Sequence, residues 1–360
     1  MKVVLIGVGQ AGGKITQRLA EYDYDMGFGA VQGAIAVNTA RADLQNLDID
    51  TMLIGRDRVK GHGVGGDNEL GAEIMQEEAT EVLDGLEGQL TSEAEAVVVA
   101  AGLGGGTGSG GAPALARELK RVYDIPVYVL GILPGRDEGA IYQANAGRSL
   151  KTVAREADSL LLVDNDAWRT AGESVQEGFA EVNDNIAQRF GLLFASGEID
   201  AGDEVAESVV DSSEIINTLR AGGMAAIGYA SAAASPDAGD NVNAITSTTR
   251  NALLTGTSVP NVVKAQTGLL VVAGHPERIS RKGVERARKW LEEETGSMEV
   301  RGGDFPLDSD RLASLVLLGG VERSSRIEEF LDRAREAQDK EEATVDADEA
   351  FTNEELEDLF

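Results

Sequence analysis

The sequence predicts an α/β protein in which a parallel, Rossmann-like sheet is followed by a long central helix and a second, smaller α+β domain. Two observations support this prediction. Short apolar runs alternate with amphipathic stretches through the first half of the chain, and such alternation produces right-handed βαβ units with helices on both faces of the sheet. Glycine-rich segments directly follow two of these runs, at the carboxyl ends of strands, where parallel sheets bind ligands.

The pattern of apolar residues gives the individual elements in order. The strands expected in the first half are residues 2–6, 34–37, 52–54, 96–100, 127–132 and 159–163, and the helices between them include 68–83, 112–123 and 145–157. A long helix is expected from Ser174 to about Phe194, because apolar side chains recur there at helical spacing. Further strands at 225–230, 268–273, 298–301 and 312–318 then indicate the smaller domain.

The composition is strongly acidic. The 360 residues include 62 Asp and Glu against 32 Lys and Arg, which gives a net charge of −30. This charge repels nucleic-acid phosphates and anionic membrane surfaces, so neither is expected as a partner. An acidic surface suits molar salt, where the Debye length falls to about 3 Å. We therefore expect a cytoplasmic protein of an extreme halophile.

Several kinds of chemistry are excluded by the residue types present. The chain has no cysteine, which excludes disulfides, thiolate metal sites and cysteine nucleophiles. With only His62 and His275, a histidine-based catalytic or zinc site is not expected. No apolar run approaches the ~18 residues that a membrane span requires, and no signal peptide is expected.

The segment 104–110 has the composition of a phosphate-binding loop. Five glycines in seven positions surround Thr107 and Ser109, between an apolar strand and a helix. Glycine lets the backbone approach a ligand closely, and successive N–H groups at a helix N-terminus bind anions. A flexible linker is the alternative, but linkers are not normally placed between a buried strand and a helix.

A second glycine loop occupies residues 7–13. Its glycines fit the dinucleotide-binding fingerprint, but the second strand ends in Asn38 rather than an acid, and the next acid is Asp43. A Walker A loop does not fit either, because Lys14 is displaced by one position and Ile15 follows it. Two such loops suit a nucleoside triphosphate held by backbone amides.

These motifs resemble a known family. Residues 104–110 resemble the signature loop of the tubulin/FtsZ superfamily, in the tubulin form of the motif, which has a serine at the position of Ser109. Gly9-Gln10-Ala11-Gly12 resembles the first tubulin loop. Over about residues 1–325 the chain is most similar to CetZ, the tubulin-like proteins of haloarchaea. The resemblance implies a cytoskeletal GTPase that binds GTP or GDP with Mg²⁺, assembles head-to-tail into filaments and controls cell shape.

The resemblance also implies a division of the chain. Residues 1–173 would be the GTP-binding domain, 174–197 the central helix, 198–335 the C-terminal activation domain, and 336–360 an acidic, flexible tail. Apolar residues recur within the end of this tail. A short helix that docks a protein partner and a solvated tail are both open interpretations.

The nucleotide contacts that the resemblance implies come from several loops and from the long helix. They are Gly9, Gln10, Ala11, Gly12, Asn38, Gly65, Gly66, Gly104, Gly105, Gly106, Thr107, Gly108, Ser109, Glu138, Asn165, Phe179 and Asn183. Glu138 would contact the ribose, and Asn165 would read the guanine edge through its amide. Phe179 would stack on the base while Asn183, four residues along the helix, hydrogen-bonds it. Taken alone, Asn165 also suits a turn and Phe179 suits a core position.

Three further positions near the predicted nucleotide contacts need separate interpretation. Tyr142 stands where FtsZ usually has an arginine, so an arginine contact to the phosphates is not expected there. Gln10 and Asp67 are candidates for indirect, water-mediated contacts to Mg²⁺. Gln10 could equally be a plain loop residue, and Asp67 could cap the helix that follows it.

The resemblance places the catalytic residues in a separate segment. Asp211 and Glu214 correspond to the two catalytic carboxylates of the family, which act on the nucleotide of the next subunit. FtsZ has an asparagine where this chain has Val209. The same acids also suit an N-cap and first helical turn. Two other functions stay open: a GTP-binding scaffold with little turnover, and an NAD(P)-dependent oxidoreductase.

Overall fold

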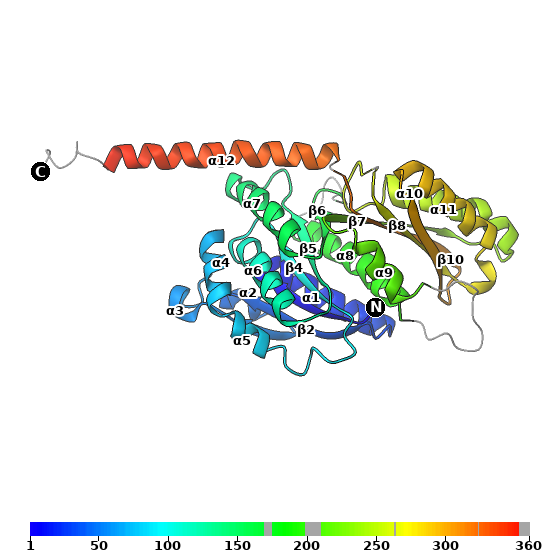
Figure 1. Cartoon of the computed structure of the whole chain (residues 1–360), viewed down its shortest axis with the longest axis horizontal. Coiled ribbons are helices and arrows are strands. Elements are labelled where there is room, and N and C mark those ends of the chain that lie inside the picture. The colour runs from blue at the N-terminus through cyan, green and yellow to red at the C-terminus, as the bar shows by residue number, and fades with distance from the viewer. Residues whose placement is uncertain (169–174, 199–209, 263, 323, 353–360) are drawn as a thin grey trace, which may run out of the picture.

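The computed structural model describes residues 1–168, 175–198, 210–262, 264–322 and 324–352. Its strands form a ten-stranded sheet in the order β3-β2-β1-β4-β5-β6-β7-β10-β8-β9 (Figure 1). The strand bounds are β1 Val3–Val8, β2 Val31–Asn38, β3 Asp50–Leu53, β4 Ala96–Gly102, β5 Val127–Leu133, β6 Ser159–Asp164, β7 Met224–Ala233, β8 Thr267–Gly274, β9 Glu299–Pro306 and β10 Arg311–Gly319. All the strands predicted from the sequence are present.

Helices lie on both faces of the first half of the sheet. Their bounds are α1 Gly9–Met26, α2 Arg41–Leu44, α3 Arg56–Val59, α4 Asn68–Glu77, α5 Ala79–Asp84, α6 Gly106–Val122, α7 Ala140–Glu156 and α8 Val175–Ser196. The later helices are α9 Ser212–Leu219, α10 Val242–Leu254, α11 Arg281–Thr295 and α12 Ser325–Thr352, with short 3₁₀ turns at Ala238–Asn241 and Pro276–Arg278.

The strands from β3 to β7 are all parallel, as the alternating pattern predicts. Every residue of β1 and β5 is buried, because helices cover both faces. Ile6 and Val8 face one hydrophobic core together with α4, α6 and α7. Val3 and Leu5 face a second core formed with α1 and α8.

The second half of the sheet is joined to the first through a short contact. β6 and β7 pair over two positions, Leu160 with Met224 and Leu161 with Ala225. Beyond β7 the sheet is mixed, because β10 runs antiparallel to both β7 and β8 while β9 runs parallel to β8. α10 and α11 cover one face of this half and α9 covers the other. The expected α+β domain is therefore present as an extension of the same sheet.

Three helix boundaries differ from the sequence prediction. α6 begins at Gly106, so part of the glycine loop is already the first turn of the helix. α7 begins at Ala140, five residues earlier than predicted. The helix predicted over 68–83 is broken at Glu78 (φ −106°, ψ 13°), which separates α4 from α5. Ser174, the predicted start of the central helix, lies outside the described residues.

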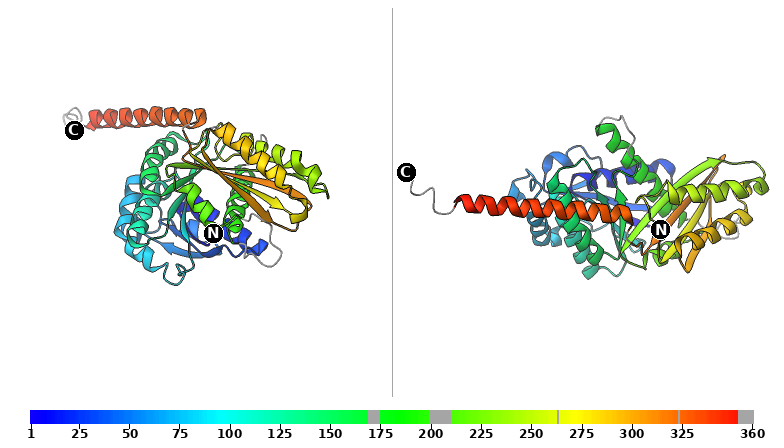
Figure 2. Two further views of the ribbon diagram at one scale, coloured as in Figure 1. Left: turned by 45° about the vertical axis from the view of Figure 1, so that its right-hand side comes forward. Right: turned by 90° about the horizontal axis from the view of Figure 1, so that it is seen from above.

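The C-terminal helix α12 continues past residue 336, where the sequence predicts a flexible tail. It lies along α7 and extends beyond it (Figures 1 and 2). Phe330 is fully buried and Ala334 and Ala337 are nearly so, so an apolar stripe docks the first part of this helix. That stripe includes Ala337, so the docked part of the helix extends just past the predicted boundary at residue 336. Residues 353–360 lie outside the described residues.

Candidate nucleotide-binding site

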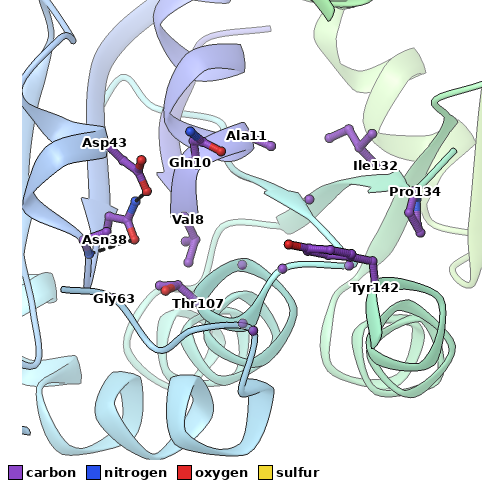
Figure 3. Close-up of a pocket in the computed structure, with 18 of the residues that line it drawn as sticks. Val8, Gln10, Ala11, Asn38, Asp43, Gly63, Thr107, Ile132, Pro134 and Tyr142 are labelled. Atoms are coloured by element: carbon purple, nitrogen blue, oxygen red, sulfur yellow. Dashed lines mark hydrogen bonds between the residues drawn. The ribbon is translucent and has the colours of Figure 1, made fainter. Parts of the chain in front are cut away.

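A cleft of about 420 Å³ opens at the carboxyl ends of the parallel strands (Figure 3). It is lined by residues that follow β1, β2, β4, β5 and β6, together with the side of α8. A volume of this size lies within the usual range for small-molecule sites. Most residues assigned to nucleotide binding line it, namely Gly9, Gln10, Ala11, Asn38, Gly65, Gly66, Gly104–Gly108, Glu138, Asn165, Phe179 and Asn183.

The two glycine loops interlock at the bottom of the cleft. Gly9 has φ of +74°, and a Cβ added to it would lie 3.0 Å from the backbone nitrogen of Gly108. A Cβ on Gly108 would lie 2.6 Å from the carbonyl oxygen of Gly102. Gly12 does not line the cleft, because it packs beneath it, where a Cβ would lie 2.1 Å from the Ala100 carbonyl oxygen. These glycines let the first loop lie against the start of α6.

The N-terminus of α6 faces the cleft without a side-chain cap. Gly105 is the N-cap residue, and its position leaves space for a ligand, since no other atom lies within 4 Å of a Cβ built there. The first N–H groups of a helix lack intrahelical partners and carry partial positive charge. Backbone N–H groups of this kind can bind phosphate oxygens.

The two hydroxyl residues of the signature loop behave differently. Thr107 lines the cleft and its Oγ1 lies 2.7 Å from Oγ1 of Thr39, which links the end of β2 to α6. Ser109 does not line the cleft, because its hydroxyl donates to the carbonyl oxygen of Gly105. Ser149 in turn donates to the carbonyl oxygen of Ser109 at 2.8 Å. Ser109 therefore stabilises the first turn of α6 from within.

A third loop, residues 63–67, closes one side of the cleft. Gly65 and Gly66 line it with φ values of +63° and +92°. Asp67 does not line it, and its carboxylate accepts the backbone N–H of Leu70 at 2.9 Å as the N-cap of α4. Asn145, which sequence reasoning missed, donates to the carbonyl oxygens of Gly66 at 2.7 Å and Gly104 at 3.1 Å. This buried amide holds two of the glycine loops together.

The loops after β5 and β6 meet on the opposite side of the cleft. The Asn165 amide donates to Oε1 of Glu138 at 3.3 Å, and the same oxygen accepts the backbone N–H of Gly135 at 2.7 Å. Phe179 is 48% exposed, so it is not the core residue that its sequence context alone would allow. It lines the cleft together with Asn183 on the same helix. The arrangement brings an amide, a carboxylate and an aromatic ring to one end of the cleft.

Other lining residues were missed by the sequence analysis. Tyr142, in the first turn of α7, extends its ring over the cleft (Figure 3). Asp43 also lines the cleft, and its carboxylate accepts the Asn38 amide at 3.0 Å. Lys14 and His62 also line the cleft. The sequence could have indicated two of these residues. Lys14 lies one position from the lysine of a Walker A loop, and Asp43 is the first acid after the strand whose end carries the ribose-binding acid in the dinucleotide fingerprint.

Asp211 and Glu214 lie away from this cleft. Asp211 is the N-cap of α9, and its carboxylate accepts the backbone N–H of Glu214 at 3.1 Å. The adjacent Ser212 donates to Glu95 at 2.5 Å, and Glu95 immediately precedes β4. The two acids therefore lie at the amino-terminal edge of the sheet, opposite the edge that forms the cleft. Val209 lies outside the described residues.

The environments of the two acids shift their pKa values in opposite directions. A hydrogen bond from the Ser213 hydroxyl at 2.5 Å, together with the backbone N–H groups at the helix start, lowers the pKa of Asp211. Burial, reinforced by the negative charge of Asp211, raises the pKa of Glu214. Paired carboxylates with separated pKa values are suited to different roles in one reaction.

Metal and membrane features are absent from the described part of the chain. No group of three or more His, Asp or Glu side chains is arranged there to hold a metal ion. No helix of that part is long and apolar enough to cross a membrane.

The fold and the glycine-lined cleft define a nucleotide-binding protein of the tubulin class. Residues 2–172 match the GTPase domain of the Tubulin/FtsZ family. A solved FtsZ dimer from M. jannaschii has the same fold, with a TM-score of 0.71 at 21% identity, covering 89% of this chain and 88% of that one.

Closer comparisons identify the branch of that class. Residues 172–336 match the C-terminal domain of tubulin-like CetZ. The chain is 68% identical over 340 residues to the tubulin-like protein CetZ2 of Haloferax volcanii, covering 94% of both. It superposes on a structure of that CetZ2, described as a GTPγS-bound protofilament, with a TM-score of 0.91, 66% identity and coverage of 95% and 100%. A GDP-bound CetZ1 monomer from the same organism gives a TM-score of 0.86, 52% identity and coverage of 94% and 100%. The chain therefore belongs to the CetZ proteins of the tubulin/FtsZ family, a family of cytoskeletal proteins.

Proposed function

We propose that this chain binds GTP in the cleft, assembles head-to-tail with copies of itself, and hydrolyses the GTP with carboxylates of the adjacent copy. The observation that carries the proposal is the separation of Asp211 and Glu214 from the cleft. They lie at opposite edges of the sheet, so one copy cannot bring its own acids to its own triphosphate. A contact between two different surfaces is heterologous and propagates into an open filament unless it closes into a ring. The CetZ2 protofilament with GTPγS supports the same arrangement for this chain.

The residues of the cleft suit the parts of a guanine nucleotide. The N-terminus of α6 and the glycine loops would bind the phosphates through backbone N–H groups. Glu138 would bind the ribose hydroxyls, and Asn165 and Asn183 the guanine edge, with Phe179 stacked on the base. The ring of Phe179 lines the cleft and is exposed rather than packed in a core, which supports the stacking role. GTP is the substrate that this set would accept in preference to ATP.

The two acids suit the hydrolytic step. Glu214, with its raised pKa, would accept the proton of the attacking water as that water adds to the γ-phosphorus and the bond to the β-phosphate oxygen breaks. Asp211, which stays ionised, would orient that water. A positioned general base typically contributes about 10²–10⁴ in rate. The remaining acceleration in phosphoryl transfer comes mainly from positioning and charge neutralisation.

Magnesium fits this site through the phosphates rather than through a carboxylate cage. Bound Mg²⁺ would neutralise charge on the β- and γ-phosphates. Gln10 lines the cleft and could hold a metal-bound water, whereas the Asp67 carboxylate caps α4 outside the cleft. We therefore retain Gln10 as an indirect ligand and assign Asp67 to the helix cap.

The proposal extends to a cytoplasmic filament that controls cell shape, with self-association as its main interaction and a protein partner for the C-terminal tail. Kinship with the CetZ proteins supports the filament. The net charge of −30 supports the absence of nucleic-acid partners.

Light scattering recorded together with phosphate release, in molar KCl with Mg²⁺, tests the proposal. GTP should raise both signals, ATP should raise neither, and the Glu214→Ala variant should scatter light with GTP while releasing almost no phosphate. The change Glu293→Ala, at an exposed position of α11, is the matched control and should behave as the parent chain. Tight GTP binding without assembly or turnover would instead identify a nucleotide-binding scaffold. Nicotinamide binding in place of GTP would identify an oxidoreductase.

A further inference from the structure

We infer that Arg326, on the C-terminal helix α12, is a positioning residue for the nucleoside end of the cleft, and that docking of α12 is thereby coupled to nucleotide binding. The inference rests on the proposed function in one respect, that the ligand of the cleft is a nucleotide. Arg326 lies outside the cleft, and it reaches the cleft through the two residues that flank Asn165.

Arg326 is buried against the end of β6. Only 4% of it is exposed, and Asp164 beside it is fully buried. Its Nη2 donates to Oδ1 of Asp164 and to Oδ2 of Asp166, each at 3.0 Å, and its Nε donates to Oδ2 of Asp164. One guanidinium thus holds the residues before and after Asn165. A buried charge pair with this geometry is costly to break on one side, because the remaining charge has no partner.

The same guanidinium also fixes the loop after β5. Asp166 Oδ2, which Arg326 contacts, accepts the backbone N–H of Arg136 at 3.0 Å. The Arg136 side chain then donates to Glu329 of α12 at 3.1 Å. This loop carries Glu138, which accepts the Asn165 amide. Two residues of α12, one turn apart, therefore hold both loops that form the nucleoside end of the cleft.

The rest of α12 is docked on α7, whose first turn also lines the cleft. Gly147 of α7 lies against Ala334, so closely that a Cβ on the glycine would lie 2.6 Å from the alanine Cβ. Gln338 donates to the carbonyl oxygen of Ala144 at 3.3 Å. Tyr142, two residues before Ala144, lines the cleft. Lifting α12 from the body would therefore release the loops after β5 and β6 and uncover α7.

Such an arrangement has a reciprocal consequence. If docked α12 increases the affinity for a nucleotide, the bound nucleotide must stabilise the docked helix by the same factor. A partner that binds the C-terminal region and undocks α12 would then weaken nucleotide binding. Bound GTP would oppose this undocking by the same factor. The Arg326 contacts lead to Glu138 and Asn165, so we expect the effect to fall on the ribose and base rather than on the phosphates.

The test compares nucleoside and phosphate recognition by calorimetry in molar KCl with Mg²⁺. Because Arg326→Met alone would leave Asp164 buried and unpaired, the main variant combines Arg326→Met with Asp164→Asn. Arg335→Met, which removes an exposed ion pair with Asp332 on the same helix, is the control. The double variant should bind GTP between about 5- and 150-fold more weakly, the usual range of coupling between sites. Its affinity for inorganic triphosphate should match that of the control.

Hydrogen exchange supplies a second, independent readout. GTP should slow amide exchange in residues 326–339 of the parent chain and of Arg335→Met, and it should not do so in the double variant. Unchanged GTP affinity in the double variant, or equal weakening of GTP and triphosphate, would overturn the inference while leaving the proposed function intact. Failure of the parent chain itself to bind GTP would overturn the proposed function, and the inference with it.

Discussion

The carboxylate of Asp211 accepts the backbone N–H of Glu214 at 3.1 Å, so the same two residues form the N-cap of α9 and the proposed catalytic pair. The two readings of these acids, as a helix cap and as a catalytic pair, are therefore compatible. The cap fixes the first turn of α9, and this turn sets the position of Glu214. The pair has separated pKa values without lying in the cleft of its own chain.

Mixing two variants tests whether the acids act on a neighbouring copy. Glu214→Gln keeps its cleft but should lose about 10²–10⁴ in phosphate release. Gly105→Trp, which places a large side chain in the open space of the cleft, should bind no GTP and release none. An equimolar mixture should recover turnover, because the second variant supplies its acids to the cleft of the first. Phosphate release is measured for each variant alone and for the mixture. A mixture as inactive as its two components would contradict catalysis between copies.

The pH dependence of turnover follows from the raised pKa of Glu214. A general base must be ionised, so phosphate release should fall with falling pH at a point above 4.5, the ordinary glutamate value. Asp211, with its lowered pKa, should stay ionised through this range. A pH–rate profile measures the inflection. An inflection at or below the ordinary glutamate value would exclude Glu214 as the base.

Stability should change with pH in the opposite sense for the two acids. A raised pKa in the folded state means that Glu214 contributes stability below its unfolded pKa and loses it as pH rises through the folded pKa. Asp211 contributes stability above its unfolded pKa and loses it as pH falls through its lowered folded value. Glu214→Gln should therefore gain thermal stability over the parent chain at neutral pH, and the gain should shrink as the pH falls. Thermal unfolding at several pH values measures the difference, and a gain that grows on acidification would contradict it.

The strands were predictable because buried parallel strands form uninterrupted apolar runs, as at 96–100 and 127–132. Helix starts were less predictable. α6 begins within its glycine loop because the interlock of Gly9 and Gly108 is a tertiary contact, and no local propensity favours glycine in a helix. Only the end of the docked part of α12, at Ala337 and Gln338, falls in the predicted tail. The prediction differs there because acidic residues outnumber alanines from residue 336 on.

The residues that line the cleft with their backbone could be predicted from the glycine motifs. The residues that support the cleft by contacting other residues were harder to predict. Ser109 and Gly12 belong to the motifs but support the cleft from beneath it. Asn145 and Arg326 have no motif around them, and their roles arise from bonds to residues far away in sequence. Hydrogen bonds between residues far apart in the sequence produce no local motif, so a sequence analysis cannot detect them.

A pair of glycine substitutions should separate the structural and ligand-facing positions of the signature loop. Gly108→Ala places a methyl group 2.6 Å from one backbone carbonyl oxygen and 3.2 Å from another. Such overpacking typically costs about 1–3 kcal/mol. Gly105→Ala meets no atom within 4 Å and has a φ of −74°, which alanine accepts. We expect Gly108→Ala to lower the melting temperature, and Gly105→Ala to keep it while weakening GTP binding. Equal melting temperatures for the two variants would contradict the interlock.

Removal of the exposed aromatic ring should reduce nucleoside affinity without affecting the fold. Phe179 is 48% exposed, so Phe179→Ala removes little core packing and should leave the melting temperature nearly unchanged. Stacking of a base on an aromatic side chain is worth about 1–3 kcal/mol, so the GTP dissociation constant should rise by about 5- to 150-fold. Phe179→Tyr keeps the ring and is the matched control, with affinity close to that of the parent chain. Binding of inorganic triphosphate should be the same for all three proteins, because the phosphates would contact the glycine loops and α6. If Phe179→Ala bound GTP as tightly as Phe179→Tyr, the base would not lie against this ring, and the assignment of the guanine end of the cleft would be wrong.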